Sequence, residues 1–132
     1  MPNTKAIGVA FADPEFESVT VTGPVAATGA LTGTQFKLNA PVTKTASFSL
    51  GDAENFVVCN GAGSITVTFP TASANTGRVV WLKTIAAQTV VSASSNVLPI
   101  GSATPGTAIL AASAGANATL VCDGTNWVIM TS

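Results

Sequence analysis

Ala118-Thr119-Leu120-Val121-Cys122-Asp123-Gly124-Thr125-Asn126-Trp127-Val128-Ile129-Met130 is the stretch of sequence that decides the fold. Two runs rich in β-forming residues flank the pair Asp123-Gly124. An Asp-Gly pair favours the type I′ turn of a two-residue hairpin, because that turn needs positive φ at both central residues. The sequence therefore predicts that the chain closes with a β-hairpin.

Both faces of this hairpin are apolar. Regular alternation places four side chains on one face, namely Leu120, Cys122, Trp127 and Ile129. The other face carries Val121, Val128 and Met130. A hairpin that is apolar on both sides must be covered on both sides, so we expect it to lie inside the fold or against a partner subunit.

Length and charge limit the classes of partner. The 132 residues suffice for one compact domain with a core. Charged residues make up only 8% of the chain, so its surface must be rich in hydroxyls, amides and small apolar groups, which suits packing against copies of itself.

The net charge is −1 and the cations are scattered, so nucleic acid is not an expected partner. No apolar run reaches the roughly 20 residues of a membrane span, and no secretory signal is recognisable, so we expect no membrane partner and a cytoplasmic protein.

The two cysteines, Cys59 and Cys122, each end a predicted strand just before an Asx-Gly turn. One interpretation places these two turns side by side and pairs the cysteines in a disulfide. The other makes both residues buried thiols that act as small hydrophobic side chains. We favour the buried thiols, because cytoplasmic synthesis argues against an obligatory disulfide.

Residues 1–17 combine apolar anchors and acidic side chains around Pro14, and we predict that they form an N-terminal docking arm. The predicted docking residues are Ile7, Val9, Phe11, Asp13, Glu15 and Phe16. The alternative interpretation is a disordered leader. A calcium site on Asp13, Glu15 and Glu17 is a weaker alternative, since neither a turn glycine nor further ligands accompany the three carboxylates.

Residues 18–41 contain short alternating apolar pieces that are broken by Thr-Gly pairs. One copy of such a segment buries little apolar surface, so we favour an extended stem in which several chains wind together. The predicted subunit-interface residues are Val19, Val21, Leu31, Phe36 and Leu38. The alternative is a plain Gly/Thr-rich linker.

Residues 42–132 read as about eight short strands without a convincing helix. Phe56–Cys59 and Ile65–Phe69 flank Asn60-Gly61-Ala62-Gly63 and predict a second hairpin. Arg78–Lys83 predicts a central strand that is covered on both faces. The fold class that follows is all-β: a compact antiparallel β-sandwich or barrel-like domain, preceded by an extended N-terminal arm and a short β stem.

The residues that most catalytic sites depend on are scarce. The chain has no histidine and no tyrosine, so neither a Ser-His nor a Cys-His nucleophile can form. Asp52 and Glu54 sit beside a predicted turn, where solvated carboxylates are expected, and two cysteines without histidine do not make a zinc site. Trp81 and Trp127 lie in strongly apolar strands, so packing is favoured over sugar stacking. We therefore predict no catalytic residue, no metal and no cofactor, and a protein that is not an enzyme.

Three stretches carry a resemblance to a known group of proteins: Gly63-Ser64-Ile65-Thr66-Val67-Thr68-Phe69-Pro70, Gly77-Arg78-Val79-Val80-Trp81-Leu82-Lys83 and the closing hairpin. In this order they resemble strand-and-turn patterns of the small β-domains in tailed-bacteriophage virion proteins. The resemblance covers about residues 42–131, with Phe69 where leucine is commoner. The preceding segment is similar to the stems of phage fibres, which are typically homotrimeric. The resemblance thus implies a homotrimeric structural component of a phage particle.

Two functions are compatible with the resemblance. The first is a capsid decoration (cement) or head-fibre protein on the outer surface of the head, which binds the major capsid protein or other virion proteins through its arm. The shortness of the chain favours this function. The second is a short tail fibre or adhesin whose C-terminal domain binds a host-surface glycan.

Overall fold

The computed structural model describes residues 20–30, 32–35 and 37–132. The chain divides into two units, Met1–Phe36 and Lys37–Ser132, and each is described by itself. The predicted arm, residues 1–17, lies outside the described residues. Within the predicted stem, the described residues form no strand and no helix, and Val21 is 52% exposed. The described part of this segment therefore lacks the β-strands of the predicted stem.

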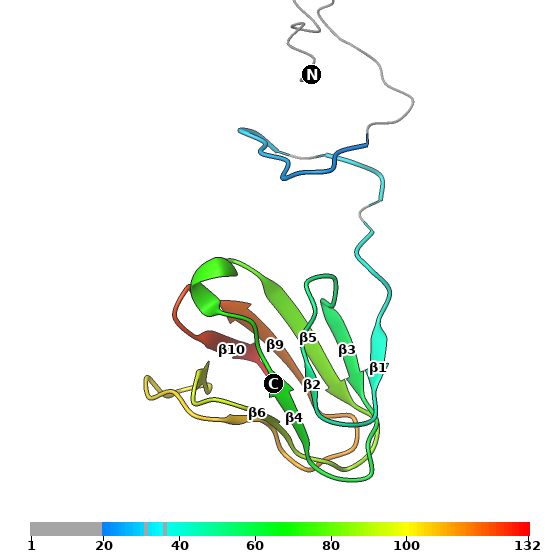
Figure 1. Cartoon of the computed structure of the whole chain (residues 1–132), viewed down its shortest axis with the longest axis vertical. Helices are drawn as coiled ribbons and strands as arrows, with labels where there is room; N and C mark the ends of the chain where they lie inside the picture. Colours follow the sequence, from blue (N-terminus) through cyan, green and yellow to red (C-terminus); the bar gives the residue numbers. More distant parts are fainter. Residues whose placement is uncertain (1–19, 31, 36) are drawn as a thin grey trace, which may run out of the picture. The chain divides into compact units, whose positions relative to one another are not determined.

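The regular secondary structure of the second unit is almost entirely β-strand (Figure 1). The described residues form ten of them: β1 (Val42–Lys44), β2 (Phe48–Ser49), β3 (Phe56–Cys59), β4 (Ile65–Thr68), β5 (Val79–Thr84), β6 (Val90–Ser92), β7 (Val97–Leu98), β8 (Ala108–Leu110), β9 (Asn117–Cys122) and β10 (Trp127–Thr131). One 3₁₀ turn, Ala72–Ala74, follows β4. The predicted all-β class is confirmed.

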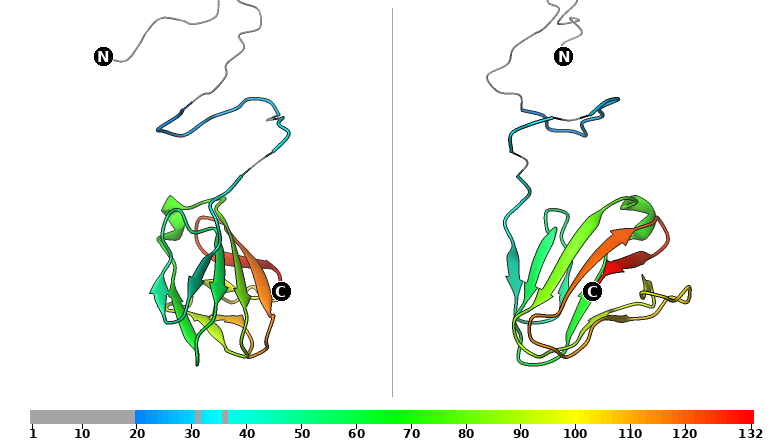
Figure 2. Two further views of the ribbon diagram at one scale, coloured as in Figure 1. Left: turned by 90° about the vertical axis from the view of Figure 1, so that its right-hand side faces the viewer. Right: turned by 180° about the vertical axis from the view of Figure 1, so that it is seen from behind.

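The strands form two sheets, which Figure 2 shows as two layers. The six-stranded sheet has the order β1-β3-β5-β9-β10-β7, and the four-stranded sheet has the order β2-β4-β6-β8. The first six strands alternate between the sheets, so the chain winds through both layers three times. Equivalent strands of successive turns therefore run parallel, as in β1/β3/β5 and β2/β4/β6. Parallel neighbours need a crossover connection, and here a strand of the opposite sheet takes that place.

The predicted antiparallel architecture is therefore wrong for the first half of the domain, and so is the predicted hairpin at residues 56–69. β3 and β4 belong to different sheets, because the loop between them crosses from one layer to the other. This loop packs on neighbouring turns of the winding: Asn60 N–H donates to Lys44 O at 2.8 Å, and Gly61 N–H to Gln88 Oε1 at 2.7 Å. A Cβ on Gly61 would lie 2.7 Å from Thr45 O, so the glycine permits this close stacking.

Antiparallel pairing appears with β8, β9 and β10, whereas β7 runs parallel to β10. The described antiparallel pairs are β5/β9, β9/β10 and β6/β8, so both sheets are mixed. The closing hairpin is confirmed with the predicted alternation, since Trp127 pairs with Cys122 and Ile129 with Leu120.

The turn of this hairpin differs from the predicted two-residue type I′ turn. Four residues, 123–126, connect the strands, and only Gly124 among them has a positive φ, of 95°. Asp123 Oδ1 accepts hydrogen bonds from Thr125 N–H at 2.7 Å and Asn126 N–H at 2.6 Å. The bonds from Asn126 and Thr125 lower the pKa of the Asp123 carboxyl. Asp123 thus stabilises a longer loop through its side chain, which explains why an Asp-Gly pair occurs there without a type I′ turn.

The core lies between the two sheets and is formed by the alternate residues that point inward. Trp127 is completely buried, and its ring stacks on Phe69 with centroids 4.7 Å apart. The expectation that Trp127 packs in the core is confirmed. The inward residues of the six-stranded sheet include Val57, Val80 and Leu120, each at most 1% exposed.

Both cysteines are buried and unpaired, as favoured from the sequence. Cys59 pairs with Thr84 at the end of β5, whereas Cys122 N–H donates to Arg78 O just before its start. Arg78 and Thr84 are six residues apart along the chain, which corresponds to roughly 20 Å at about 3.3 Å per residue. A disulfide needs Cα atoms within about 7 Å, so the side-by-side arrangement of the two turns is wrong. Burial raises the pKa of the Cys59 thiol.

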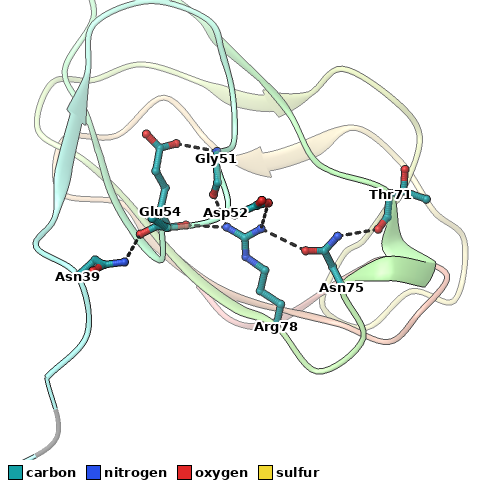
Figure 3. A network of polar contacts seen from close by, with 8 residues as sticks. Asn39, Gly51, Asp52, Glu54, Thr71, Asn75 and Arg78 are labelled. Atoms are coloured by element: carbon teal, nitrogen blue, oxygen red, sulfur yellow. Dashed lines mark hydrogen bonds and ion pairs between the residues drawn. The ribbon is translucent and has the colours of Figure 1, made fainter. Parts of the chain in front are cut away.

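Arg78 holds together the turns at one end of the domain (Figure 3). Its guanidinium donates to the carbonyl oxygens of Gly51 and Glu54 and to Asn75 Oδ1. Glu54 in turn accepts hydrogen bonds from Lys44 Nζ and from Gly51 N–H. These two donors, Lys44 first, lower the pKa of the Glu54 carboxyl. The side chain of Glu54 is therefore an internal link between turns, whereas the neighbouring Asp52 is fully exposed.

Candidate docking surface

The six-stranded sheet has a second face, which points away from the core; we refer to it as the outer face. Its side chains lie in rows across the strands, because paired residues share a side of the sheet. One row contains Phe56, Trp81 and Thr119. A second row contains Val79, Val121, Val128 and Leu98. A third row, at the end of β5, contains Val58, Lys83 and Asn117.

Trp81 is the central side chain of the outer face. It is 37% exposed, and its ring stacks on that of Phe56 with centroids 4.7 Å apart and an interplanar angle of 16°. The predicted coverage of Arg78–Lys83 on both faces is thus wrong within one chain: Val80, Leu82 and Thr84 are buried, whereas Trp81 and Lys83 are exposed.

A groove of about 370 Å³ runs beside this aromatic pair. Lys83 and Asn117 provide polar groups where the strands end, and the rest of the lining is apolar: Pro41, Phe56, Val57, Val58, Trp81, Leu82 and Ala118. We refer to it as the Trp81 groove. Its lining is mostly apolar, so its chemistry suits an apolar side chain or ring better than a charged ligand.

Lys83 is the one charged side chain in the three rows of the outer face. Within the described part of the chain, Lys44 pairs with Glu54 and Arg78 lies near Asp52, whereas Lys83 has no ion pair. A single cation at the rim of an apolar surface cannot neutralise several phosphates. It can instead orient a partner that approaches the face.

Met130 protrudes from β10 near the end of the chain. It is 60% exposed and lies at an irregularity of the β9/β10 pairing, between Ile129 and Thr131. Met130 is the extra residue of this irregularity, because Ile129 pairs with Leu120 and Thr131 with Thr119. The expectation that the second side of the hairpin is apolar is correct, but within one chain that side is only partly covered.

Most of the predicted site residues lie outside the described residues. These are Ile7, Val9, Phe11, Asp13, Glu15, Phe16, Val19, Leu31 and Phe36, together with Glu17 of the alternative calcium site. Of the predicted subunit-interface residues, Val21 and Leu38 are described, and they are 52% and 41% exposed. These exposed fractions describe a single chain, whereas the intertwined stem requires several chains. The intertwined stem therefore stays a prediction.

The outer face is the functional candidate that sequence reasoning missed. The signal was present in Arg78–Lys83, because Trp81 alternates with two residues that became buried and shares its side with Lys83. A lysine in that alternating position indicates that this side of the strand meets solvent at its end.

No protein-family model, curated protein or solved structure matches this chain. Among the described residues, no three His, Cys, Asp or Glu side chains gather into a possible metal site. No helix among the described residues has both the length and the hydropathy of a membrane span.

Proposed function

We propose that this chain is a non-enzymatic structural protein of a tailed-bacteriophage particle, of the capsid decoration (cement) or head-fibre type. The observation that carries the proposal is the outer face, where Trp81 and Phe56 form an apolar surface with a single charge. Such a surface is typical of contacts between proteins, in which aromatic residues are enriched and charges are depleted. The resemblance of the strand-and-turn patterns to virion β-domains supports the same assignment.

In this proposal, residues 1–17 attach the protein to the major capsid protein on the outer surface of the head and stabilise the shell. The apolar docking residues, such as Phe11 and Phe16, supply buried area, and the acidic residues between them supply orientation. Three copies associate through residues 18–41, whose described apolar side chains, including Val21 and Leu38, are exposed in one chain. Assembly takes place in the host cytoplasm.

The test is re-addition of purified protein to heads from which it has been stripped. The full chain should bind and raise the resistance of the heads to heat or chelation. A chain that lacks residues 1–17, and a full-length Phe11→Glu/Phe16→Glu variant, should fold but not bind. Ile85→Glu is a matched control, because Ile85 is an exposed apolar residue outside both the arm and residues 18–41. Attachment that survives loss of the arm would contradict the proposal.

One observation favours the second candidate function, a short tail fibre or adhesin that binds a host glycan. Trp81 presents an exposed ring beside the polar groups of Lys83 and Asn117, and aromatic rings can stack on sugar rings. In that case the protein should bind host cells and block infection, and Trp81→Ala should abolish both effects. Labelling of the protein in micrographs of the particle separates the two functions, since a decoration protein lies on the head and an adhesin on the tail.

A further inference from the structure

We propose that Gln88 protects Asn60 from spontaneous deamidation, because it holds the backbone N–H of Gly61 that the reaction has to use. This role concerns the chemical durability of the domain, whichever partner the domain binds. The site is the loop that leads from β3 in one sheet to β4 in the other, where the chain has its single Asn-Gly pair, Asn60-Gly61.

An Asn-Gly pair is especially prone to deamidation, because glycine has no side chain that hinders ring closure. The backbone nitrogen of Gly61 gives its proton to a base and attacks Cγ of Asn60. The new N–Cγ bond closes a succinimide ring, the bond from Cγ to the side-chain nitrogen breaks, and that nitrogen takes up a proton and leaves as ammonia. Water then opens the ring to aspartate or isoaspartate. The reaction therefore needs a Gly61 nitrogen that is free to move and to lose its proton.

Packing requires a glycine directly after Asn60. A Cβ on Gly61 would lie 2.7 Å from Thr45 O and 3.2 Å from Ile65 Cδ1. Any other residue would therefore push apart two neighbouring turns of the winding. The parallel stacking of the strands thus gives Asn60, whose side chain is exposed to water, the partner that makes it most labile.

The peptide group between Asn60 and Gly61 is held by bonds on both of its neighbouring N–H groups. Asn60 N–H donates to Lys44 O at 2.8 Å, and Gly61 N–H donates to Gln88 Oε1 at 2.7 Å. The second bond occupies the nitrogen that would attack, so its proton is less available to base. Ring closure also requires this nitrogen to swing toward Cγ of Asn60, and the same bond opposes that movement.

Gln88 contributes this one contact at a cost. Its side chain is 2% exposed, and the bond from Gly61 is its one side-chain hydrogen bond among the described residues. Its Nε2 atom is buried without a hydrogen-bond partner in the described part of the chain. A buried amide that satisfies only one of its polar atoms costs free energy, so packing alone would favour an apolar residue here. The contact with Gly61 therefore explains why the position carries an acceptor.

The experiment follows deamidation of the full, folded chain in mildly alkaline buffer. Trypsin then releases residues 45–78, in which Asn55 and Asn75 are internal references, and peptide mass mapping counts aspartate and isoaspartate at Asn60. Asn60 should react at least about tenfold more slowly in the folded chain than in the same peptide after release, because reaction in the folded chain waits for local opening. Gln88→Met keeps the size of the side chain but removes the acceptor. It should speed the reaction about tenfold, the factor that corresponds to the loss of one hydrogen bond.

Ser92→Ala is the matched control. Ser92 is likewise buried, at 4% exposed, and its hydroxyl donates to Asn96 Oδ1 at 2.6 Å, so the variant also loses a buried polar contact but leaves Gly61 alone. Its rate of deamidation at Asn60 should stay within about twofold of wild type. Near-ultraviolet circular dichroism of the buried Trp127 verifies that each variant is folded.

Hydrogen exchange of the Gly61 amide in wild type is a second measurement that does not depend on the folding of any variant. This amide should be protected from exchange, since it is the donor to Gln88. An unprotected Gly61 amide, equal rates in the folded chain and the released peptide, or an unchanged rate in folded Gln88→Met would each overturn the proposal. So would an equal acceleration in Ser92→Ala, because the general stability of the fold would then be what protects Asn60.

Discussion

Phe56 and Trp81 lie directly opposite each other on the parallel strands β3 and β5, and their rings stack with centroids 4.7 Å apart on the solvent side of the six-stranded sheet. Trp127 forms an equally close stack with Phe69, but inside the core. The domain thus contains two stacked aromatic pairs with the same centroid distance, one that stabilises the fold and one that is available to a partner.

The two tryptophans should therefore differ in their contribution to stability. Trp127→Ala removes a completely buried ring and should lower the free energy of unfolding by about 3–5 kcal/mol. Trp81→Ala removes a partly exposed ring and its stack on Phe56, and should cost less, about 1–2 kcal/mol, from the stack and the smaller area that the ring buries. Urea denaturation at one fixed protein concentration measures both losses, with the remaining tryptophan as the fluorescent reporter. Equal losses would contradict the assignment of Trp81 to a surface.

Arg78 should be the most important cation of the domain. Arg78→Met removes the guanidinium hydrogen bonds to the carbonyl oxygens of Gly51 and Glu54 and should lower the free energy of unfolding by about 2–3 kcal/mol. Arg78→Lys should recover little of this loss, since an ammonium lacks the planar fork that reaches both oxygens. Lys83→Met is the control and should change stability by less than about 0.5 kcal/mol, because Lys83 is exposed and has no ion pair among the described residues. Chemical denaturation of the three variants decides between these outcomes.

Stability should fall in acid through Glu54. Hydrogen bonds from Lys44 and Gly51 lower the pKa of Glu54 in the folded state below its ordinary value of 4.5. A carboxyl whose folded pKa is depressed contributes stability that is fully present above its unfolded pKa and is lost as the pH falls through its folded pKa. Melting temperatures from pH 7 down to pH 3 should therefore decline for wild type below about pH 4.5.

Glu54→Gln should be less stable than wild type at pH 7 and should show a shallower decline below pH 4.5. Asp123, whose pKa is also lowered, acts in the same direction and should leave part of the decline in place. Asp52→Asn is the matched control, since the Asp52 side chain is fully exposed. An unchanged pH profile in Glu54→Gln would show that the carboxyl does not act as this link between turns.

Gly124 should resist substitution. Its φ of 95° is unfavourable for any other residue, and a Cβ there would lie 2.8 Å from Thr76 Oγ1. Gly124→Ala should thus lower the free energy of unfolding by about 1–2 kcal/mol. Gly106→Ala should be close to neutral, because its φ is not positive and a Cβ would meet open space. Thermal unfolding of both variants tests the loop geometry; a tolerated Gly124→Ala would argue for a different turn.

The sequence predicted the closing hairpin because its signals are local. The alternation of Leu120 and Cys122 across from Ile129 and Trp127 depends on strand period alone, and the structure has that pairing. The turn was predicted incorrectly, because Asp-Gly also fits a longer loop in which Asp123 accepts two backbone hydrogen bonds.

By itself, then, the sequence determined the all-β class, the closing pair of strands and the burial of Trp127 and both cysteines, all of which follow from alternation and from turn residues. Only the tertiary structure decided that Asn60-Gly61-Ala62-Gly63 leads from one sheet to the other, because a short glycine-containing loop joins strands equally well within a sheet or between sheets. That choice depends on contacts of Gly61 with Thr45 and Gln88, which are distant in the chain. The same parallel winding brings Phe56 beside Trp81, so the outer face with its groove is a product of topology, and strand period alone does not encode it.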